Sequence, residues 1–277
     1  MHEDHASWLN AILHLLPESV QQHWVDVFVL NSWLVIIILA LLAWAGSRRL
    51  QLRPRGLQNV WEMYVRWLRD FCRNEMGPGG EKHAPLLGTI FVYILFLNLF
   101  GLVPGFLTPT MTLNMTVPLA LLVFGYVQWM GVREQGFGGY LMHFIGEPIV
   151  KYEPTVKYFL FLPLVIFFHG LMLIVHLIGE LAKPLSLSVR LFGNMFGEET
   201  SLVQMAALGA AVMAATAIGP FPGIPLPVQF INVALHLLVG PIQAFIFFIL
   251  SAAYIAMATH QEHAEEHHEV ESVSEAS

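Results

Sequence analysis

The sequence predicts an all-α polytopic membrane protein, and three observations support that prediction. The chain has 277 residues, of which 56% are hydrophobic and only 12% are charged, whereas soluble domains carry about 45–50% apolar and about 25% charged residues. The 13 Lys and Arg residues fall in a few clusters. Between these clusters lie apolar runs of about 20 residues, the length of a transmembrane helix. This pattern excludes a disordered chain and disfavours an ordinary soluble enzyme.

The first half of the chain predicts three spans and one amphipathic helix. The spans are expected at 25–46, 85–103 and 113–130. Between the first two, residues 57–73 place apolar side chains on one helical face and polar and charged ones on the other. Such a helix is suited to lying in the membrane interface or to packing on another subunit, and the two are compatible. The stretch 136–153, with four glycines and Pro148, is expected to be irregular or a short re-entrant hairpin.

The positions of the basic residues predict the topology. Eight of them lie between Arg48 and Lys82, and three more between Arg133 and Lys157. The positive-inside rule places both basic loops in the cytoplasm, so the N-terminal segment 1–23 is expected outside. No basic region precedes the first span, which therefore reads as a retained span rather than a cleaved signal peptide. An odd number of crossings then places the C-terminus in the cytoplasm.

The region 158–217 does not read as a simple span. A helix of this length measures about 90 Å, whereas one upright crossing needs about 30 Å. Gly219–Pro227 is rich in Pro and Gly and predicts a turn before a last helix at 228–259. We therefore expect two overlong, steeply tilted helices forming a hairpin, the first of them broken or kinked. The Glu- and His-rich tail 260–277 is expected to be disordered and solvated, with a loose metal site as the alternative.

Polar residues inside these two helices are costly to bury. A charge at mid-bilayer costs about 2.5–3.5 kcal/mol on insertion scales, so such residues indicate an ion path by default. The alternative for His, Asn and Gln is ordinary hydrogen bonding between helices. The polar residues in question are His169, His176, Glu180, Lys183, Arg190, Asn194, Glu198, Glu199, Gln204, Asn232, His236 and Gln243.

Arg190 is the most informative of these residues. Asn194, Gly197 and Ser201 fall within about 40° of it on a helix, whereas Glu199 falls on the opposite face. Small residues on such a stripe let another helix approach closely. An arginine keeps its proton even where it is poorly solvated, so it attracts a carboxylate and repels a passing cation. Because no residue of this chain is an obvious moving carrier, we expect the paired carboxylate on a partner.

The segment Lys183–Glu199, KPLSLSVRLFGNMFGEE, resembles the signature of subunit a of the bacterial F-type ATP synthase membrane sector. Gln243–Ala258 resembles the last helix of that family. The likeness extends through RPRGLQNVWE, through GTIFVYILFLNLFGLVPGF, and through Pro109, Thr110 and Asn114. It covers nearly the whole chain, from about residue 24 to residue 260.

The resemblance implies a non-catalytic, ion-translocating stator subunit in the bacterial inner membrane, without a cofactor or metal. H⁺ is the expected ion because it is the commoner case, with Na⁺ as the alternative that the sequence does not decide. Implied partners are a ring of small carboxylate-bearing subunits, the peripheral-stalk subunit b, the rest of the ATP synthase and the lipid bilayer, but not nucleic acid. Arg190 would separate two offset half-channels, and the outer one would be lined by Asn194, Glu199, His236 and Gln243. Further candidates are His169, His176, Glu180, Glu198 and Asn232, with Gly197 and Ser201 facing the ring.

Two other classes of function remain open on the residues alone. One is a secondary ion transporter or channel that works without partners. The other is a membrane enzyme subunit that binds haem b through His169, His176 and His236. The chain has neither HExxH nor GxxxxGK[ST], so the motifs of a zinc protease and of a P-loop nucleotide site are missing. Any ATP chemistry is therefore expected in another chain.

Overall fold

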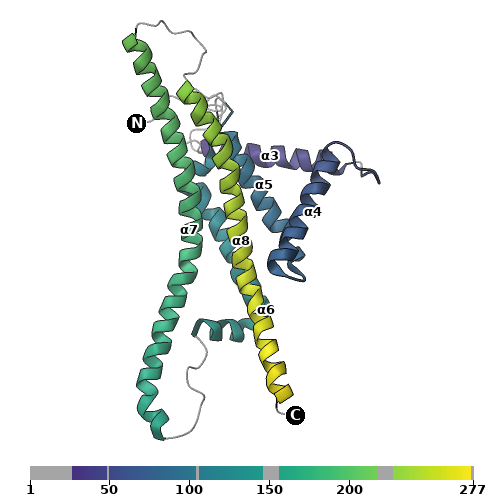
Figure 1. The fold of residues 1–277 in the computed structure, drawn as a ribbon, viewed down its shortest axis with the longest axis vertical. Coiled ribbons are helices and arrows are strands. Elements are labelled where there is room, and N and C mark those ends of the chain that lie inside the picture. The colour runs from purple at the N-terminus through teal and green to yellow at the C-terminus, as the bar shows by residue number, and fades with distance from the viewer. Residues whose placement is uncertain (1–26, 49, 104–105, 146–155, 217–226, 276–277) are drawn as a thin grey trace, which may run out of the picture.

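The computed structural model describes residues 27–48, 50–103, 106–145, 156–216 and 227–275, and this part of the chain contains helices and no strand. Five helices are long and apolar enough to cross a membrane, with spans at Phe28–Ser47, Gly80–Phe100, Leu113–Arg133, Phe167–Met205 and Val233–Ala258. The prediction of an all-α polytopic membrane protein is therefore confirmed. The helices are arranged as an elongated bundle in which α7 and α8 are the longest elements (Figure 1).

The helix bounds follow the apolar runs of the sequence. In chain order the elements are α3 (Val27–Ser47), α4 (Leu57–Met76), the 3₁₀ turn η1 (Gly80–His83), α5 (Ala84–Phe100), the 3₁₀ turn η2 (Pro109–Met111), α6 (Leu113–Ile145), α7 (Val156–Thr216) and α8 (Pro227–Glu275). The extracytoplasmic segment expected at 1–23 and the turn expected at Gly219–Pro227 lie almost entirely outside the described residues.

Two expectations about these elements were wrong, and a third was wrong for the part of its stretch that the structure describes. The helix at 158–217 is not broken, because α7 runs as one bowed helix from Val156 to Thr216 (Figure 1). Pro184 removes one backbone donor, but it is buried where α7 lines a small cavity together with α6 and Tyr254 of α8. The helix stays continuous through this residue.

The tail and the glycine-rich stretch also differ from expectation. Residues 260–275 continue α8 instead of forming a disordered tail. Once a helix exists, each further residue adds a backbone hydrogen bond without a new nucleation cost, and Ala and Glu are good helix formers. In the expected irregular stretch, Gly136 has a φ of 72° and makes a kink, after which residues 137–145 are again helical. The next ten residues lie outside the described part.

Helix α4 is held to its neighbours by polar contacts as well as by its apolar face. The Trp61 indole N–H donates to the Leu42 carbonyl of α3 at 3.3 Å, and the Tyr64 hydroxyl donates to the Gly88 carbonyl of α5 at 2.8 Å. Burial raises the pKa of the Tyr64 phenol, so the hydroxyl remains a donor. The opposite face of α4 is exposed and carries its arginines. This confirms the amphipathic pattern; its position relative to a bilayer stays a prediction.

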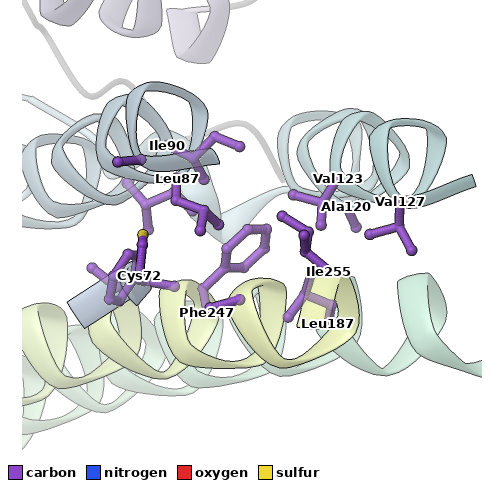
Figure 2. Close-up of a cluster of buried hydrophobic side chains, with 14 of the residues drawn as sticks. Cys72, Leu87, Ile90, Ala120, Val123, Val127, Leu187, Phe247 and Ile255 are labelled. Carbon is purple, nitrogen blue, oxygen red and sulfur yellow. The ribbon is translucent and has the colours of Figure 1, made fainter. Parts of the chain in front are cut away.

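The apolar core lies where α5, α6, α7 and α8 meet, with the end of α4 completing it. Figure 2 shows Leu87 and Ile90 of α5, Val123 and Val127 of α6, and Phe247 and Ile255 of α8 pointing into one cluster. Cys72 of α4 is fully buried in the same cluster, and this burial raises the pKa of its thiol to about 11. The core fixes α8 against α5, and it thereby sets the position of the polar residues on the outer half of α8.

Candidate functional site

Arg190 lies on an open stripe of α7. The residues of α7 that are buried against its neighbours include Leu187, Ser188, Leu191 and Met195, whereas Ser186, Arg190, Gly193 and Gly197 are exposed on the other side. A methyl group added at Gly193 or at Gly197 would meet nothing within 4 Å. The stripe is therefore free for a partner helix to approach closely, as small residues allow in membranes.

The guanidinium of Arg190 has no carboxylate partner in the part of the chain that the structure describes. Among the described residues no ion pair or hydrogen bond joins it to an acidic side chain. A guanidinium remains charged under all ordinary conditions, and an unpaired charge within a membrane is strongly unfavourable. This arrangement fits a carboxylate supplied from outside the chain.

Two residues predicted for the site meet beside this stripe. The Asn194 side-chain amide donates to Oε1 of Gln243 at 2.6 Å and so links α7 to α8. Gln243 is 1% exposed, whereas Asn194 is exposed next to Arg190. The bond thus connects the buried amide of Gln243, inside the bundle, with the exposed amide of Asn194, beside Arg190.

The carboxylate that faces His236 is Glu198 rather than Glu199. Oε2 of Glu198 lies 3.5 Å from Nδ1 of His236, and the two side chains are only 11% and 3% exposed. Glu199 is half-buried and projects from α7 about 100° further round the helix. The resemblance had placed Glu199 in the path and Glu198 only among the further candidates. Which of the two neighbours faces His236 depends on how α8 is rotated against α7.

A further set of buried polar contacts extends this pair toward α5 and η2. Nε2 of His236 contacts the Asn98 backbone carbonyl at 3.0 Å, and the Asn98 side-chain amide donates to the Gly240 carbonyl at 3.0 Å. The Thr110 hydroxyl in turn donates to Oδ1 of Asn98 at 2.8 Å. Asn98 and Thr110 are fully buried, so these hydrogen bonds lie inside the helix bundle.

A second polar cluster surrounds Glu180. Its carboxylate accepts from the Gln128 amide of α6 at 3.0 Å and forms an ion pair with Lys183. The Lys183 ammonium also lies 5.7 Å from the ring centre of Tyr254. Burial, and then the nearby Glu180 carboxylate, raise the pKa of the Tyr140 phenol to about 12. Tyr140 stands after the kink at Gly136, so the kink brings a phenol toward the end of this cluster.

Arg190 therefore lies between two polar clusters along one helix. Glu180 precedes it by ten residues and Glu198 follows it by eight, which correspond to about 15 Å and about 12 Å along a helix. With the predicted topology, the Glu180 cluster is nearer the cytoplasm and the Glu198 cluster is nearer the outside. Glu180 and Glu198 therefore belong to two separate clusters.

The remaining predicted residues take less defined positions. His169 and His176 are half-buried on α7, in the direction of its N-terminus from Glu180, and Ser201 is half-buried beyond Glu198. Asn232 lies in α8, but its side chain is outside the described residues. Within the described residues no group of three His, Cys, Asp or Glu side chains is arranged to hold a metal ion.

Sequence reasoning missed Asn98 and Gln128 as site residues. Asn98 is the single amide of its span, in the run FLNLF, and Gln128, in the run YVQWM, shares its span only with Asn114 near the other end. That isolation was the available signal, since an amide inside a span needs a hydrogen-bond partner on another helix. The partner could not be named without the packing.

The fold and these polar clusters define a class: a polytopic helical membrane protein whose arginine, without an acidic partner among the described residues, lies between two half-buried carboxylate sites. The family model "ATP synthase A chain" matches residues 29–256. The chain is 36% identical over 258 residues to ATP synthase subunit a 2 of Syntrophotalea carbinolica, covering 92% of this chain and 96% of the relative. It is 35% identical to ATP synthase subunit a of Geobacter sulfurreducens over 84% of this chain and 87% of the relative, and likewise 35% identical to that of Protochlamydia amoebophila over 84% and 80%. The chain belongs to the ATP synthase A chain family.

Proposed function

We propose that this chain is the proton-translocating stator subunit of a rotary ATP synthase, in which Arg190 separates two half-channels. The observation that supports this most directly is the position of Arg190. It is exposed on an open stripe of small residues, has no acidic partner among the described residues, and lies between two carboxylate clusters. Membership of the ATP synthase A chain family supports the same conclusion.

The outer half-channel is formed by Glu198, His236, Asn194 and Gln243. The Glu198–His236 pair can hold and exchange a proton, because a carboxylate and an imidazole are both proton-binding groups. The Asn194–Gln243 hydrogen bond leads from the interior toward Arg190. Glu199, the carboxylate expected from the sequence, stays a candidate for the approach to this pair.

The inner half-channel runs past Glu180, with Gln128 and Tyr140 beside it and His176 one turn away on α7. Lys183 stabilises the Glu180 carboxylate as an ion pair, which makes this cluster a polar surface inside an apolar bundle. Because it lies on the other side of Arg190 from Glu198, a proton cannot pass between the clusters through this chain alone.

A carboxylate on a partner subunit carries the proton between the two half-channels. A ring of small subunits fits the open stripe of Ser186, Gly193 and Gly197. The positive charge of Arg190 favours the ionised form of a carboxylate that approaches it, so the carrier loses its proton near the arginine and regains one from the other half-channel. A proton that crosses 100 mV gains about 2.3 kcal/mol, and this free energy drives rotation only if the direct route is blocked by Arg190.

The same proposal covers the setting of the chain. It lies in the bacterial inner membrane with its N-terminus outside and its C-terminus in the cytoplasm, and it conducts H⁺ without a cofactor. Subunit b and the other ATP synthase subunits hold it in place. The chain itself performs no covalent chemistry.

The decisive experiment replaces Arg190 with Ala in the assembled ATP synthase in membrane vesicles. We expect ATP synthesis driven by a proton gradient to be abolished. Leu185→Ala is the matched control, because Leu185 is 65% exposed on another face of the same helix and should leave synthesis unchanged. Coupled ATP synthesis by the Arg190→Ala enzyme would overturn the proposal.

A second experiment assigns the outer carboxylate. Passive proton flow through the membrane sector should fall strongly in Glu198→Gln and less in Glu199→Gln, because only Glu198 faces His236 at 3.5 Å. The opposite order would assign the role to Glu199. Proton flux through the purified chain alone in lipid vesicles would instead support a transporter that works without partners.

A further inference from the structure

The ring of His236 is held so that its two nitrogens face different groups. Nε2 lies 3.0 Å from the backbone carbonyl oxygen of Asn98, and Nδ1 faces Oε2 of Glu198 at 3.5 Å. A carbonyl oxygen can only accept a hydrogen bond. An ionised carboxylate also only accepts, so the shorter contact, that of Nε2 with the carbonyl, decides where the neutral ring carries its proton. The lone pair of Nδ1 then faces the carboxyl group of Glu198, which can donate to it in its protonated form.

The Asn98 carbonyl is available because it lies in the last turn of α5. The final carbonyls of a helix have no partner within it, and here the Leu102 N–H donates to Leu99 instead, at 3.1 Å. The end of α5 thus presents a free backbone acceptor to Nε2 of His236.

The Asn98 side chain keeps this carbonyl in place. Its amide donates to the Gly240 carbonyl on α8, one turn beyond His236, and its Oδ1 accepts from Thr110 of η2. The helices are close enough here that a methyl group at Gly240 would lie 3.4 Å from Cβ of Asn98. Asn98 therefore contacts α8 twice, once through its backbone and once through its side chain.

We infer that Asn98 is a positioning residue that locks His236 as the Nε2–H tautomer, so that His236 exchanges protons only through Nδ1. In the exchange, Glu198 gives its proton to Nδ1 of His236, leaving a carboxylate beside an imidazolium, and the reverse step returns it. The Asn98 carbonyl cannot take the Nε2 proton onward. The ring therefore does not pass a proton from one nitrogen to the other; it stores charge next to Glu198. The role of this stored charge in proton transport rests on the proposed function, whereas the assignment of the tautomer rests only on the contacts of His236.

Solid-state ¹⁵N NMR on the assembled ATP synthase with labelled histidine tests the tautomer directly. The His236 signal is identified by its loss in His236→Gln and is read at an alkaline pH where the ring is neutral. We expect a protonated Nε2 and an unprotonated Nδ1. A protonated Nδ1 in the neutral ring would overturn the inference, whatever the outcome of the Arg190→Ala experiment.

Asn98→Ala tests the positioning role, with Thr116→Val as the matched control. Thr116 is also fully buried and shares a hydrogen bond with Ser188 at 3.2 Å, but no described hydrogen bond joins it to Asn98. We expect Asn98→Ala to give a mixture of tautomers and a fall of about tenfold in passive proton flow, less than the roughly hundredfold or more contributed by a proton-transferring group itself. Thr116→Val should change neither. An unchanged tautomer in an assembled Asn98→Ala complex would refute the role. If His236→Gln does not assemble, the His236 signal is identified by its loss in His236→Asn instead.

Discussion

Replacing Phe248 with Ala should loosen the contact that positions α8. The Phe248 ring is fully buried, and its centre lies 4.8 Å from that of Phe71, 5.5 Å from that of Phe91 and 5.6 Å from that of Trp67. It thus joins α8 to both α4 and α5. Phe245, one turn earlier on α8, contacts Trp67 and Phe91 at 6.4 Å but is 38% exposed, which makes it the matched control.

The size of the stability loss depends on the environment of the Phe248 ring after the helices separate. In a water-soluble core a Phe→Ala change costs about 3–5 kcal/mol, part of which is transfer of the ring from water. Helix α8 stays in lipid when the bundle separates, so the transfer part largely cancels and the loss of packing remains. A cavity of about 100 Å³ at roughly 24 cal/mol per Å³ gives about 2 kcal/mol for Phe248→Ala. Lipid can fill the space left by Phe245, so its replacement should cost under about 1 kcal/mol.

The free energy of unfolding of the purified chain in mixed detergent micelles, measured by denaturant titration, checks this difference. Both variants are read against the unaltered chain under the same conditions. Equal losses for the two variants, or a larger loss for Phe245→Ala, would refute the reasoning that burial of Phe248 fixes α8.

Three further predictions concern other parts of the chain. Cys72 should resist maleimide in the folded protein, because its thiol is buried and has a pKa of about 11. Rapid labelling at pH 7 would contradict the burial. Since this pKa is raised from 9.0, the contribution of the protonated thiol to the free energy of unfolding is complete below pH 9 and falls between pH 9 and 11. Gly88→Ala should destabilise the junction of α4 and α5, because its methyl would lie 2.3 Å from Cδ2 of Leu68; an unchanged melting temperature would show that Leu68 can move aside. Gln243→Leu should slow passive proton flow through the assembled membrane sector, because it removes the acceptor of the Asn194 amide; flow equal to that of the unaltered enzyme would remove this bond from the path.

The composition of the chain and the spacing of its apolar residues were sufficient to predict the fold class and most of the helices. Apolar runs of membrane length predict spans wherever they occur, because the hydrocarbon layer sets the length. The helical period of residues 57–73 likewise predicted the amphipathic α4. The break expected in α7 was wrong because Pro184 removes one backbone donor without ending the helix, which runs from Val156 to Thr216. The prediction of a disordered tail was wrong because α8 precedes these residues, and extending an existing helix needs no new nucleation.

The candidate site divides in the same way. Arg190, Asn194, His236 and Gln243 stand out in the sequence, because polar groups in apolar helices need a reason to be there. Asn98 and Gln128 did not stand out as site residues, because a single amide on another span acquires meaning only from its partner.

The sequence by itself determined that this protein is a helical membrane protein and that Arg190 is its unusual charge, since burial cost depends on residue type and position along a helix. Only the tertiary structure decided that Glu198 faces His236, that Asn98 holds that histidine, and that no acidic side chain in the described part of the chain pairs with Arg190. Those facts depend on the rotation and depth of one helix against another. Such packing is set jointly by side chains far apart in the chain, as when Phe248 of α8 meets Phe71 of α4.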